Sequence, residues 1–197
     1  MPSPVPDLAP LTPGARRVLD AASRLFYDRG IHAVGVDTIA EVAGVTKKTL
    51  YDRFGSKETL VVSYLQHRDA RWRDDLAARL AAEEQPGIPR ILAVFDHALA
   101  WSTANSPKGC SAVNARAEVG GDEGAPVLAE VSREKTWLLD LFAELCEEGG
   151  IDDPRGTAET LMLLYEGAIV TLGMGTFAEP FTTARRCAEG VLTARTR

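Results

Sequence analysis

The sequence has few of the residues that disulfide frameworks and metal centres need. Its 197 residues include three cysteines and three histidines. Cys110, Cys146 and Cys187 are odd in number and far apart, so their spacing predicts neither a disulfide framework nor a zinc site. No apolar run approaches the roughly 20 residues that cross a bilayer. We therefore expect a cytoplasmic protein with reduced thiols, no metal, no cofactor and no membrane partner.

The sequence also lacks the patterns of common enzymes. His32, His67 and His97 stand at no metal-ligand spacing, and no glycine-rich phosphate loop follows a strand pattern. No nucleophile and general base form a recognisable arrangement. An all-α enzyme is therefore an alternative that the sequence does not favour, and we expect no enzyme activity.

Composition and charge leave a soluble globular protein with an uneven charge distribution. The chain is 45% hydrophobic and 25% charged, with a net charge of −6. Residues 12–60 nevertheless hold eight basic against six acidic side chains, a weak hint of an anionic partner. The proline-rich start, MPSPVPDLAPLT, has neither the basic nor the apolar block of a secretory signal, so we predict a disordered arm over residues 1–12.

The rest of the chain shows helical periodicity and no sustained alternation of a strand. Short segments with glycine, proline or aspartate separate the periodic stretches. The pattern predicts an all-α fold of about nine helices, the fourth long enough to connect two subdomains. The predicted helices are 13–30, 36–44, 46–55, 57–84, 89–106, 110–119, 126–148, 154–178 and 181–196.

Residues 43–60, AGVTKKTLYDRFGSKETL, carry the clearest functional pattern. Ala43-Gly44-Val45 suits a tight turn between two short helices, which is a helix-turn-helix unit. Thr46 suits the N-cap of the second helix, and Ser56 the N-cap of the next one. Hydrogen-bond donors crowd at this helix start, where the free N–H groups and the positive end of the dipole attract an anion. Leu50 and Phe54 would anchor the helix in the core.

The run IAEVAGVTKKTLYDRFGSKETL, preceded by AASRLFYDRG, resembles the N-terminal region of the TetR/AcrR repressors over about residues 14–61. The resemblance implies a DNA-binding domain at residues 13–56 and a ligand-binding and dimerisation domain at 57–197. It also implies a homodimer that binds a palindromic operator on double-stranded DNA and is released by a small-molecule effector, here unknown. Two residues depart from the family pattern. Gly35 stands where the family usually has a Ser or Thr cap, and Lys48 stands where it often has a glycine.

Seven residues are expected to contact DNA. For the two lysines the alternative is an ordinary solvated helix start, and for Tyr51 it is packing on the first helix. The predicted residues are Thr38, Thr46, Lys47, Lys48, Thr49, Tyr51 and Lys57.

The evidence for an effector site in the predicted domain at 57–197 is weaker, because apolar residues at helical spacing are also typical of an ordinary hydrophobic core. Asn114 and Glu118 share one face with Cys110, and the alternative is that this helix packs against the DNA-binding domain. Glu166 would pair with a cationic ligand, or else be solvated or dimer-facing. The predicted ligand residues are Trp72, Phe95, Trp101, Asn114, Glu118, Trp137, Met162, Tyr165 and Glu166.

Small residues in the last two predicted helices permit close helix approach and suit a two-fold four-helix interface. The sequence alone supports only burial of this stripe. The predicted interface residues are Leu161, Leu164, Ala168, Leu172, Ala184, Ala188 and Val191.

Two DNA-binding functions therefore compete. In the first, a ligand shifts the long fourth helix of a repressor and changes the separation of two reading heads, which must match half-sites about one helical turn (~34–36 Å) apart. In the second, the protein is a DNA-binding architectural or partner-protein module without an effector.

Overall fold

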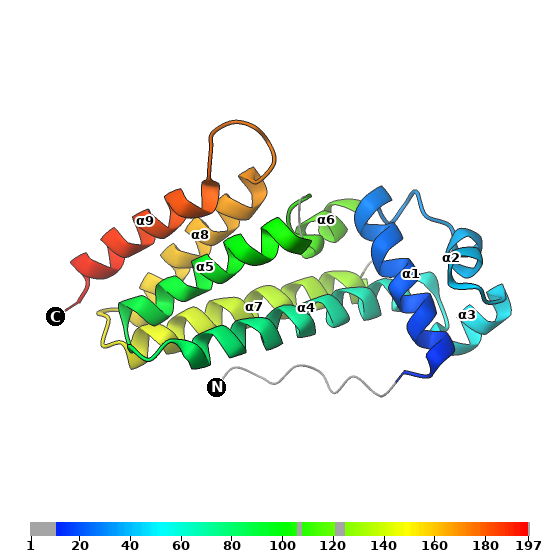
Figure 1. Cartoon of the computed structure of the whole chain (residues 1–197), viewed down its shortest axis with the longest axis horizontal. Helices are drawn as coiled ribbons and strands as arrows, with labels where there is room; N and C mark the ends of the chain where they lie inside the picture. The colour runs from blue at the N-terminus through cyan, green and yellow to red at the C-terminus, as the bar shows by residue number, and fades with distance from the viewer. Residues whose placement is uncertain (1–10, 106–107, 121–124, 197) are drawn as a thin grey trace. The chain divides into compact units, whose positions relative to one another are not determined.

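The computed structural model describes residues 11–105, 108–120 and 125–196. Within these ranges the chain forms nine α-helices and no strand, and an isolated bridge pairs Ile151 with Thr196 (Figure 1). The all-α prediction is confirmed. The helices are α1 Pro13–Arg29, α2 Val36–Ala43, α3 Lys47–Phe54, α4 Lys57–Ala82, α5 Ile88–Asn105, α6 Ser111–Glu118, α7 Ala125–Glu148, α8 Pro154–Thr171 and α9 Pro180–Ala194.

Side-chain caps define three of the helix starts. The hydroxyl oxygens of Thr12, Thr46 and Ser56 accept the amides of the residues three positions on, at 3.4, 3.1 and 3.0 Å. The caps predicted at Thr46 and Ser56 are confirmed. Thr12 therefore belongs to the start of α1 and not to the predicted arm, of which residues 1–10 lie outside the described residues.

One helix is shorter than its pattern predicts. The sequence predicted a helix over residues 154–178, but α8 ends at Thr171. Leu172 already has a non-helical backbone (φ −59°, ψ 127°), and Gly173 and Gly175 have φ values of 79° and 69°. Two glycines in the left-handed region stop the helix, and the chain crosses to α9 as the loop visible in Figure 1.

The chain divides into two compact units. We call the first the N-terminal unit; it comprises α1–α3, α4 up to Ala70, α6, and α7 up to Glu134. The second, the C-terminal unit, comprises α4 from Arg71, α5, α7 from Lys135, α8 and α9. Helices α4 and α7 thus contribute to both units, whereas the sequence placed a domain boundary between residues 56 and 57. The predicted division into a DNA-binding and a ligand-binding domain at this boundary stays a prediction.

The N-terminal unit packs α2 and α3 on α1. The predicted anchors Leu50 and Phe54 are buried, together with Val18, Leu25 and Ile39. A side chain of α1 also binds the end of α2. The Nε of Arg17 donates a hydrogen bond to the Ala43 carbonyl at 3.2 Å. This hydrogen bond satisfies one of the carbonyls that a helix end leaves unpaired.

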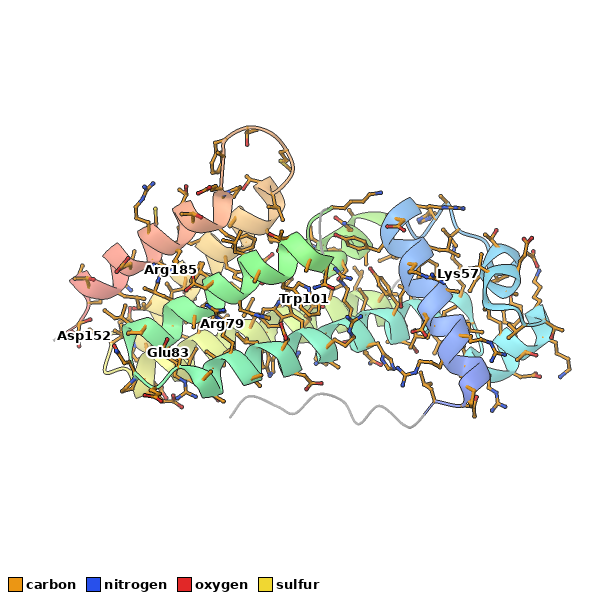
Figure 2. All side chains as sticks on the ribbon, in the orientation of Figure 1. Lys57, Arg79, Glu83, Trp101, Asp152 and Arg185 are labelled. Atoms are coloured by element: carbon orange, nitrogen blue, oxygen red, sulfur yellow. The ribbon has the colours of Figure 1, made fainter. Side chains whose placement is uncertain are left out.

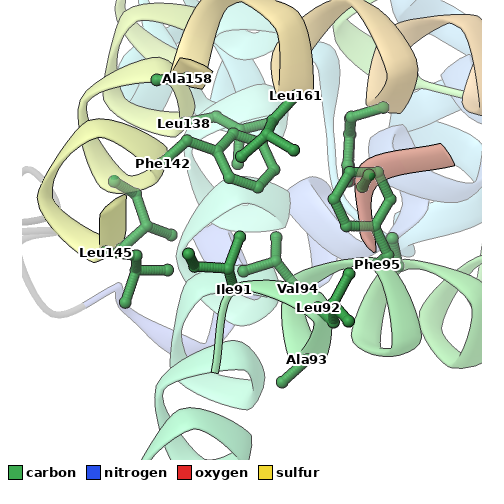
Figure 3. Packing of buried hydrophobic residues seen from close by; sticks show 14 of the residues in the cluster. Ile91, Leu92, Ala93, Val94, Phe95, Leu138, Phe142, Leu145, Ala158 and Leu161 are labelled. Atoms are coloured by element: carbon green, nitrogen blue, oxygen red, sulfur yellow. The ribbon is translucent and has the colours of Figure 1, made fainter. Parts of the chain in front are cut away.

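The C-terminal unit holds a larger core of leucine, isoleucine and aromatic side chains from α5, α7, α8 and α9. Figure 3 shows Phe95 of α5 and Leu161 of α8 facing Leu138, Phe142 and other residues of α7. The rings of Phe95 and Phe142 lie 5.7 Å apart. Burial of such side chains is worth ~1.5–3 kcal/mol each, which makes this cluster the main source of stability in the unit.

The unusual N-cap of α2 allows a direct test of the fold. Gly35 forms no side-chain cap bond, its backbone is extended (φ −80°, ψ 154°), and a Cβ there would meet nothing within 4 Å. We expect Gly35→Ser to stabilise the protein by a few tenths of a kcal/mol, and Gly35→Ala to be less stable than Gly35→Ser by ~1 kcal/mol. Urea unfolding of the two variants measures the difference, and equal stabilities would contradict the assigned cap.

Candidate functional site

The turn between α2 and α3 is built from backbone hydrogen bonds. Gly44 has left-handed angles (φ 63°, ψ 40°), and its amide donates to the Glu41 carbonyl at 3.1 Å. The amide of Val45 donates to the Ala40 carbonyl at 3.0 Å. This pair of bonds is a Schellman motif, which satisfies the carbonyls at the end of α2 and requires a residue that tolerates positive φ. The predicted helix-turn-helix is therefore confirmed as local structure.

The two threonines at the start of α3 are hydrogen-bonded to one another. Thr46 accepts the amide of Thr49, and the two hydroxyls lie 2.9 Å apart. The Thr46 hydroxyl thus serves first as the N-cap. The two threonine hydroxyls fix the start of the helix. Both residues are exposed or half-buried, so they also lie close to any anion that approaches this end.

Both lysines at this helix start are exposed and each is held by an aspartate. The Nζ of Lys47 lies 3.0 and 3.1 Å from the two carboxylate oxygens of Asp37, and this hydrogen bond raises the pKa of Lys47. The Nζ of Lys48 lies 2.7 Å from Asp52, one turn further along α3. Exposed ion pairs are worth only about 0–1 kcal/mol, so a phosphate can replace either aspartate at small cost.

The remaining predicted DNA contacts lie on the same three elements. Tyr51 on α3 is 41% exposed, and Thr38 on α2 is half-buried. Lys57 opens α4, where burial lowers the pKa of its ammonium and the nearby Glu118 opposes that shift. All seven residues thus belong to α2, α3 and their flanks within the N-terminal unit. Their contact with DNA stays a prediction.

Glu118, which the sequence offered as an effector contact, binds the loop between α1 and α2. It ends α6 and accepts the backbone amide of His32, in the loop between α1 and α2, at 2.9 Å. A Cβ on Gly30 would lie 3.0 Å from the same carboxylate, so glycine permits this approach. This contact agrees with the alternative that the helix packs against the DNA-binding domain, and an effector role for Glu118 stays a prediction. Asn114 is exposed on α6 and belongs, like Glu118, to the N-terminal unit.

A buried ionic cluster joins α4 to α7, and the sequence analysis did not find it. Arg133 of α7 donates to Asp69 of α4 at 2.7 Å and also to Glu130. Gln66 donates to the other oxygen of Glu130 at 3.1 Å. Burial by itself lowers the pKa of Arg133, but the hydrogen bonds to both carboxylates outweigh burial and raise it. No local pattern pairs residues 64 positions apart, so only the fold reveals the cluster.

The C-terminal unit brings five of the predicted ligand residues into one aromatic cluster. The ring of Trp72 lies 6.2 Å from Trp137 and 6.5 Å from Tyr165, and Tyr165 lies 6.1 Å from Phe95. Trp101, labelled on α5 in Figure 2, joins the cluster through His97. Met162 packs against the neighbouring core. These residues lie together, but their contact with an effector stays a prediction. The sequence analysis did not single out His97, whose lone position on an apolar helix face gave no signal.

Glu166 already has a cationic partner within the chain. Its carboxylate lies 2.8 Å from the Nζ of Lys135 on α7, and the same ammonium donates to the Sγ of Cys110 at 3.3 Å. The sequence predicted a cationic ligand, a solvated carboxylate or a dimer contact for Glu166. The structure instead shows a half-buried ion pair between α7 and α8.

The predicted dimer stripe lies mostly inside the chain. Leu161, Ala168, Ala184 and Ala188 are buried, and they pack α8 and α9 into the core of the same unit. Leu164, Leu172 and Val191 are half-buried, and Leu172 lies beyond the end of α8. The small residues therefore serve packing between helices of one chain, as the alternative stated. The exposed apolar residues of α8 are Leu163, 75% exposed, and Val170, 43% exposed.

Other kinds of site are not found within the described ranges. No group of histidine, cysteine or acidic residues there is arranged to hold a metal ion, and no helix among them is long and apolar enough to span a membrane. Cys110, Cys146 and Cys187, all within the described ranges, form no disulfide with one another. Burial raises the pKa of the Cys146 thiol to about 11, which keeps that sulfur protonated.

Two eight-residue helices around a left-handed glycine turn, the second opening with exposed cationic side chains, define a helix-turn-helix DNA-binding protein. Residues 18–64 match the family model for bacterial regulatory proteins of the tetR family. Over these residues the chain carries the DNA-binding domain of the TetR family, whose members are transcriptional regulators that bind DNA and are not enzymes.

Relatives and solved structures agree with this assignment. The chain is 28% identical over 157 residues to the uncharacterized HTH-type transcriptional regulator MT1294 of Mycobacterium tuberculosis (strain CDC 1551 / Oshkosh), covering 71% of this chain and 77% of that protein. The HTH-type transcriptional activator FasR of Mycolicibacterium smegmatis is 52% identical over 50 residues, 25% of this chain and 23% of FasR. The crystal structure of SCO4454, a TetR-family transcriptional regulator from Streptomyces coelicolor, matches with a TM-score of 0.81 and 29% identity, covering 94% of this chain and 97% of that one.

The contact between Glu118 and His32 predicts a local effect on the α1–α2 loop. Glu118→Ala removes the acceptor of the His32 amide, so we expect that amide to exchange with solvent about five to ten times faster, as one hydrogen bond of ~1 kcal/mol implies. Glu118→Gln keeps an acceptor oxygen and is the matched control. Hydrogen exchange followed by NMR measures both, and unchanged exchange in Glu118→Ala would contradict the assigned bond.

Proposed function

We propose that the protein is a homodimeric repressor that binds a palindromic operator and is released when a small molecule binds the C-terminal unit. The observation that carries the proposal is the exposed start of α3, where two lysines and two threonines follow a tight glycine turn. TetR-family regulators bind DNA and typically dimerise, which supports the same function. A protein of this kind acts in the cytoplasm, where its operator lies.

In the proposed complex, the N-terminus of α3 enters the major groove. The free N–H groups and the dipole at that end attract phosphate, and Lys47 and Lys48 exchange their aspartates for phosphate or a base edge. The exposed Tyr51 lies against the sugar–phosphate wall. Lys57 at the start of α4 and Thr38 on α2 supply flanking phosphate contacts.

Helix α4 offers a route from effector to DNA. Its residues up to Ala70 belong to the N-terminal unit, and Trp72 on the same helix belongs to the aromatic cluster of the C-terminal unit. An effector that binds this cluster shifts α4, and the dimer population then moves toward a spacing of the reading helices that no longer matches the operator. Phe95, Trp101, Trp137, Met162 and Tyr165 are the other proposed contacts.

Activation is a second candidate, because FasR, named a transcriptional activator, is 52% identical over 50 residues. The two functions differ in where the operator lies relative to the promoter and in the sign of the response. A reporter gene placed downstream of the bound DNA distinguishes repression from activation. Deletion of the regulator raises expression if it represses and lowers expression if it activates.

The start of α3 gives the test of DNA binding. We expect Lys48→Ala to weaken binding by ~1–3 kcal/mol if the lysine reads a base, with a smaller loss and a shallower salt dependence if it contacts only phosphate. Asp52→Asn removes the carboxylate that holds Lys48 and should tighten binding. Fluorescence anisotropy with a duplex selected from random sequence by the wild-type protein measures both.

Lys108→Ala, another exposed lysine but in the C-terminal unit, is the matched control for Lys48→Ala. It should leave affinity unchanged at the same salt concentration. Equal affinities of the wild-type protein and a folded Lys48→Ala variant would remove Lys48 from the reading face. Failure of the wild-type protein to select any duplex would contradict the proposed function as a whole.

The exposed face of α8 gives the test of dimerisation. Leu163 projects an apolar side chain that is 75% exposed in the single chain, which fits burial against a second copy. We expect Leu163→Glu to convert dimers to monomers, measured by light scattering coupled to size exclusion. Leu99→Glu, an exposed leucine on α5, is the control and should stay dimeric. A dimeric Leu163→Glu variant would place the interface elsewhere.

A further inference from the structure

The aromatic cluster of the C-terminal unit contains a buried imidazole nitrogen that the fold does not satisfy. His97 on α5 is 2% exposed, and its Nε2 has no hydrogen-bond partner within the described part of the chain. Buried polar atoms in proteins nearly always have a partner, so each exception requires an explanation. The imidazole lies 5.1 Å from the ring of Trp72 and 6.1 Å from that of Trp101.

The other side of the imidazole determines which nitrogen carries the proton. Nδ1 lies 3.5 Å from the carboxylate of Asp75, and His97 also forms a hydrogen bond with the backbone of Trp72. Both groups on α4 are acceptors, so Nδ1 carries the hydrogen. Burial lowers the pKa of His97, with Asp75 and the Trp72 backbone opposing that shift. The ring is therefore neutral near pH 7, and Nε2 presents a lone pair that accepts a hydrogen bond.

The rings around this lone pair reach the protein surface. Trp72, Trp101 and Trp137 are half-buried, and Trp137 packs edge-on to Trp72 at 6.2 Å. The guanidinium of Arg73 covers one face of Trp137, 3.9 Å from the ring centroid, and that of Arg71 lies 5.8 Å over Trp101. The remaining aromatic faces on α4, α5 and α7 adjoin a buried acceptor that lacks a donor. A planar molecule can stack on these faces, and a single donor group on it would satisfy Nε2.

We propose that His97 and the three tryptophans bind a planar aromatic effector that carries a hydroxyl or N–H donor, with Nε2 of His97 as the acceptor. The proposal rests on the proposed function, because it names the class of effector and the residue that recognises it. Hydrogen bonding to a buried acceptor discriminates strongly, since an analogue without the donor leaves Nε2 unpaired. The site therefore favours a phenol or an indole over the corresponding ether or hydrocarbon.

The three tryptophans of the chain, all in this cluster, make the site directly observable. Quenching of tryptophan fluorescence in the full-length protein is titrated with para-phenylphenol and with its methyl ether, which has the same rings but no donor. We expect the phenol to bind the wild-type protein at least about tenfold more tightly than the ether. Equal affinities, or no binding of either probe, would overturn the proposal.

Three variants separate recognition from packing. His97→Leu should bind phenol and ether alike, whereas His97→Gln keeps an acceptor oxygen near the position of Nε2 and should retain the preference. Ser102→Ala changes another buried polar residue of α5 and should retain it as well. A preference that persists in a folded His97→Leu variant, checked by circular dichroism, would exclude Nε2 as the acceptor.

The same samples distinguish this inference from the proposed function. Binding of the unliganded protein to its selected DNA duplex tests the function, and the phenol–ether preference tests the site. If DNA binding holds and the preference is absent, the inference fails alone. If the preference holds but the protein binds no DNA, the proposed function fails and the site stands.

Discussion

The packing of the N-terminal unit depends on a buried ionic cluster in which one arginine pairs with two carboxylates. Asp69 on α4 and Glu130 on α7 are 5% and 6% exposed, and Arg133 donates to both. Burying an unpaired carboxylate is strongly unfavourable, and breaking a buried ion pair typically costs about 3–5 kcal/mol. Because only two residues separate the end of α3 at Phe54 from the start of α4, the contact that fixes α4 also restricts where α3 can lie.

A second contact secures the loop between α1 and α2 of the same unit. The carboxylate of Glu118 accepts the His32 amide and lies against Gly30, so α6 holds the loop that leads from α1 into α2. The helix-turn-helix is thus supported by α6 and α7 as well as by α1. A fragment that ended at residue 56 would lose Glu118, Asp69 and Arg133, and with them these polar contacts.

Local chemistry was readable from the sequence, and contacts over long sequence distances were not. Gly44 predicted the turn because glycine tolerates positive φ, and Thr46 predicted the N-cap because its hydroxyl offers a capping oxygen. The predicted dimer stripe, which included Leu161 and Ala188, indicated in the sequence that these residues are buried but not which surface covers them. The structure shows that helices of the same chain cover these two residues. The partner of Glu118 could not be named from the sequence for a related reason, because a helix face says nothing about a residue 86 positions away.

The two proposed sites differ in what they gain on binding. At α3, the exposed lysines already have partners, and exchange of an aspartate for a phosphate changes the free energy by little per contact. In the aromatic cluster, a buried nitrogen without a donor gains a whole hydrogen bond when a ligand supplies one. Allosteric coupling between sites is typically ~1–3 kcal/mol. In the proposed mechanism, one such bond is comparable to the free energy of one or two of the DNA contacts that release would have to overcome.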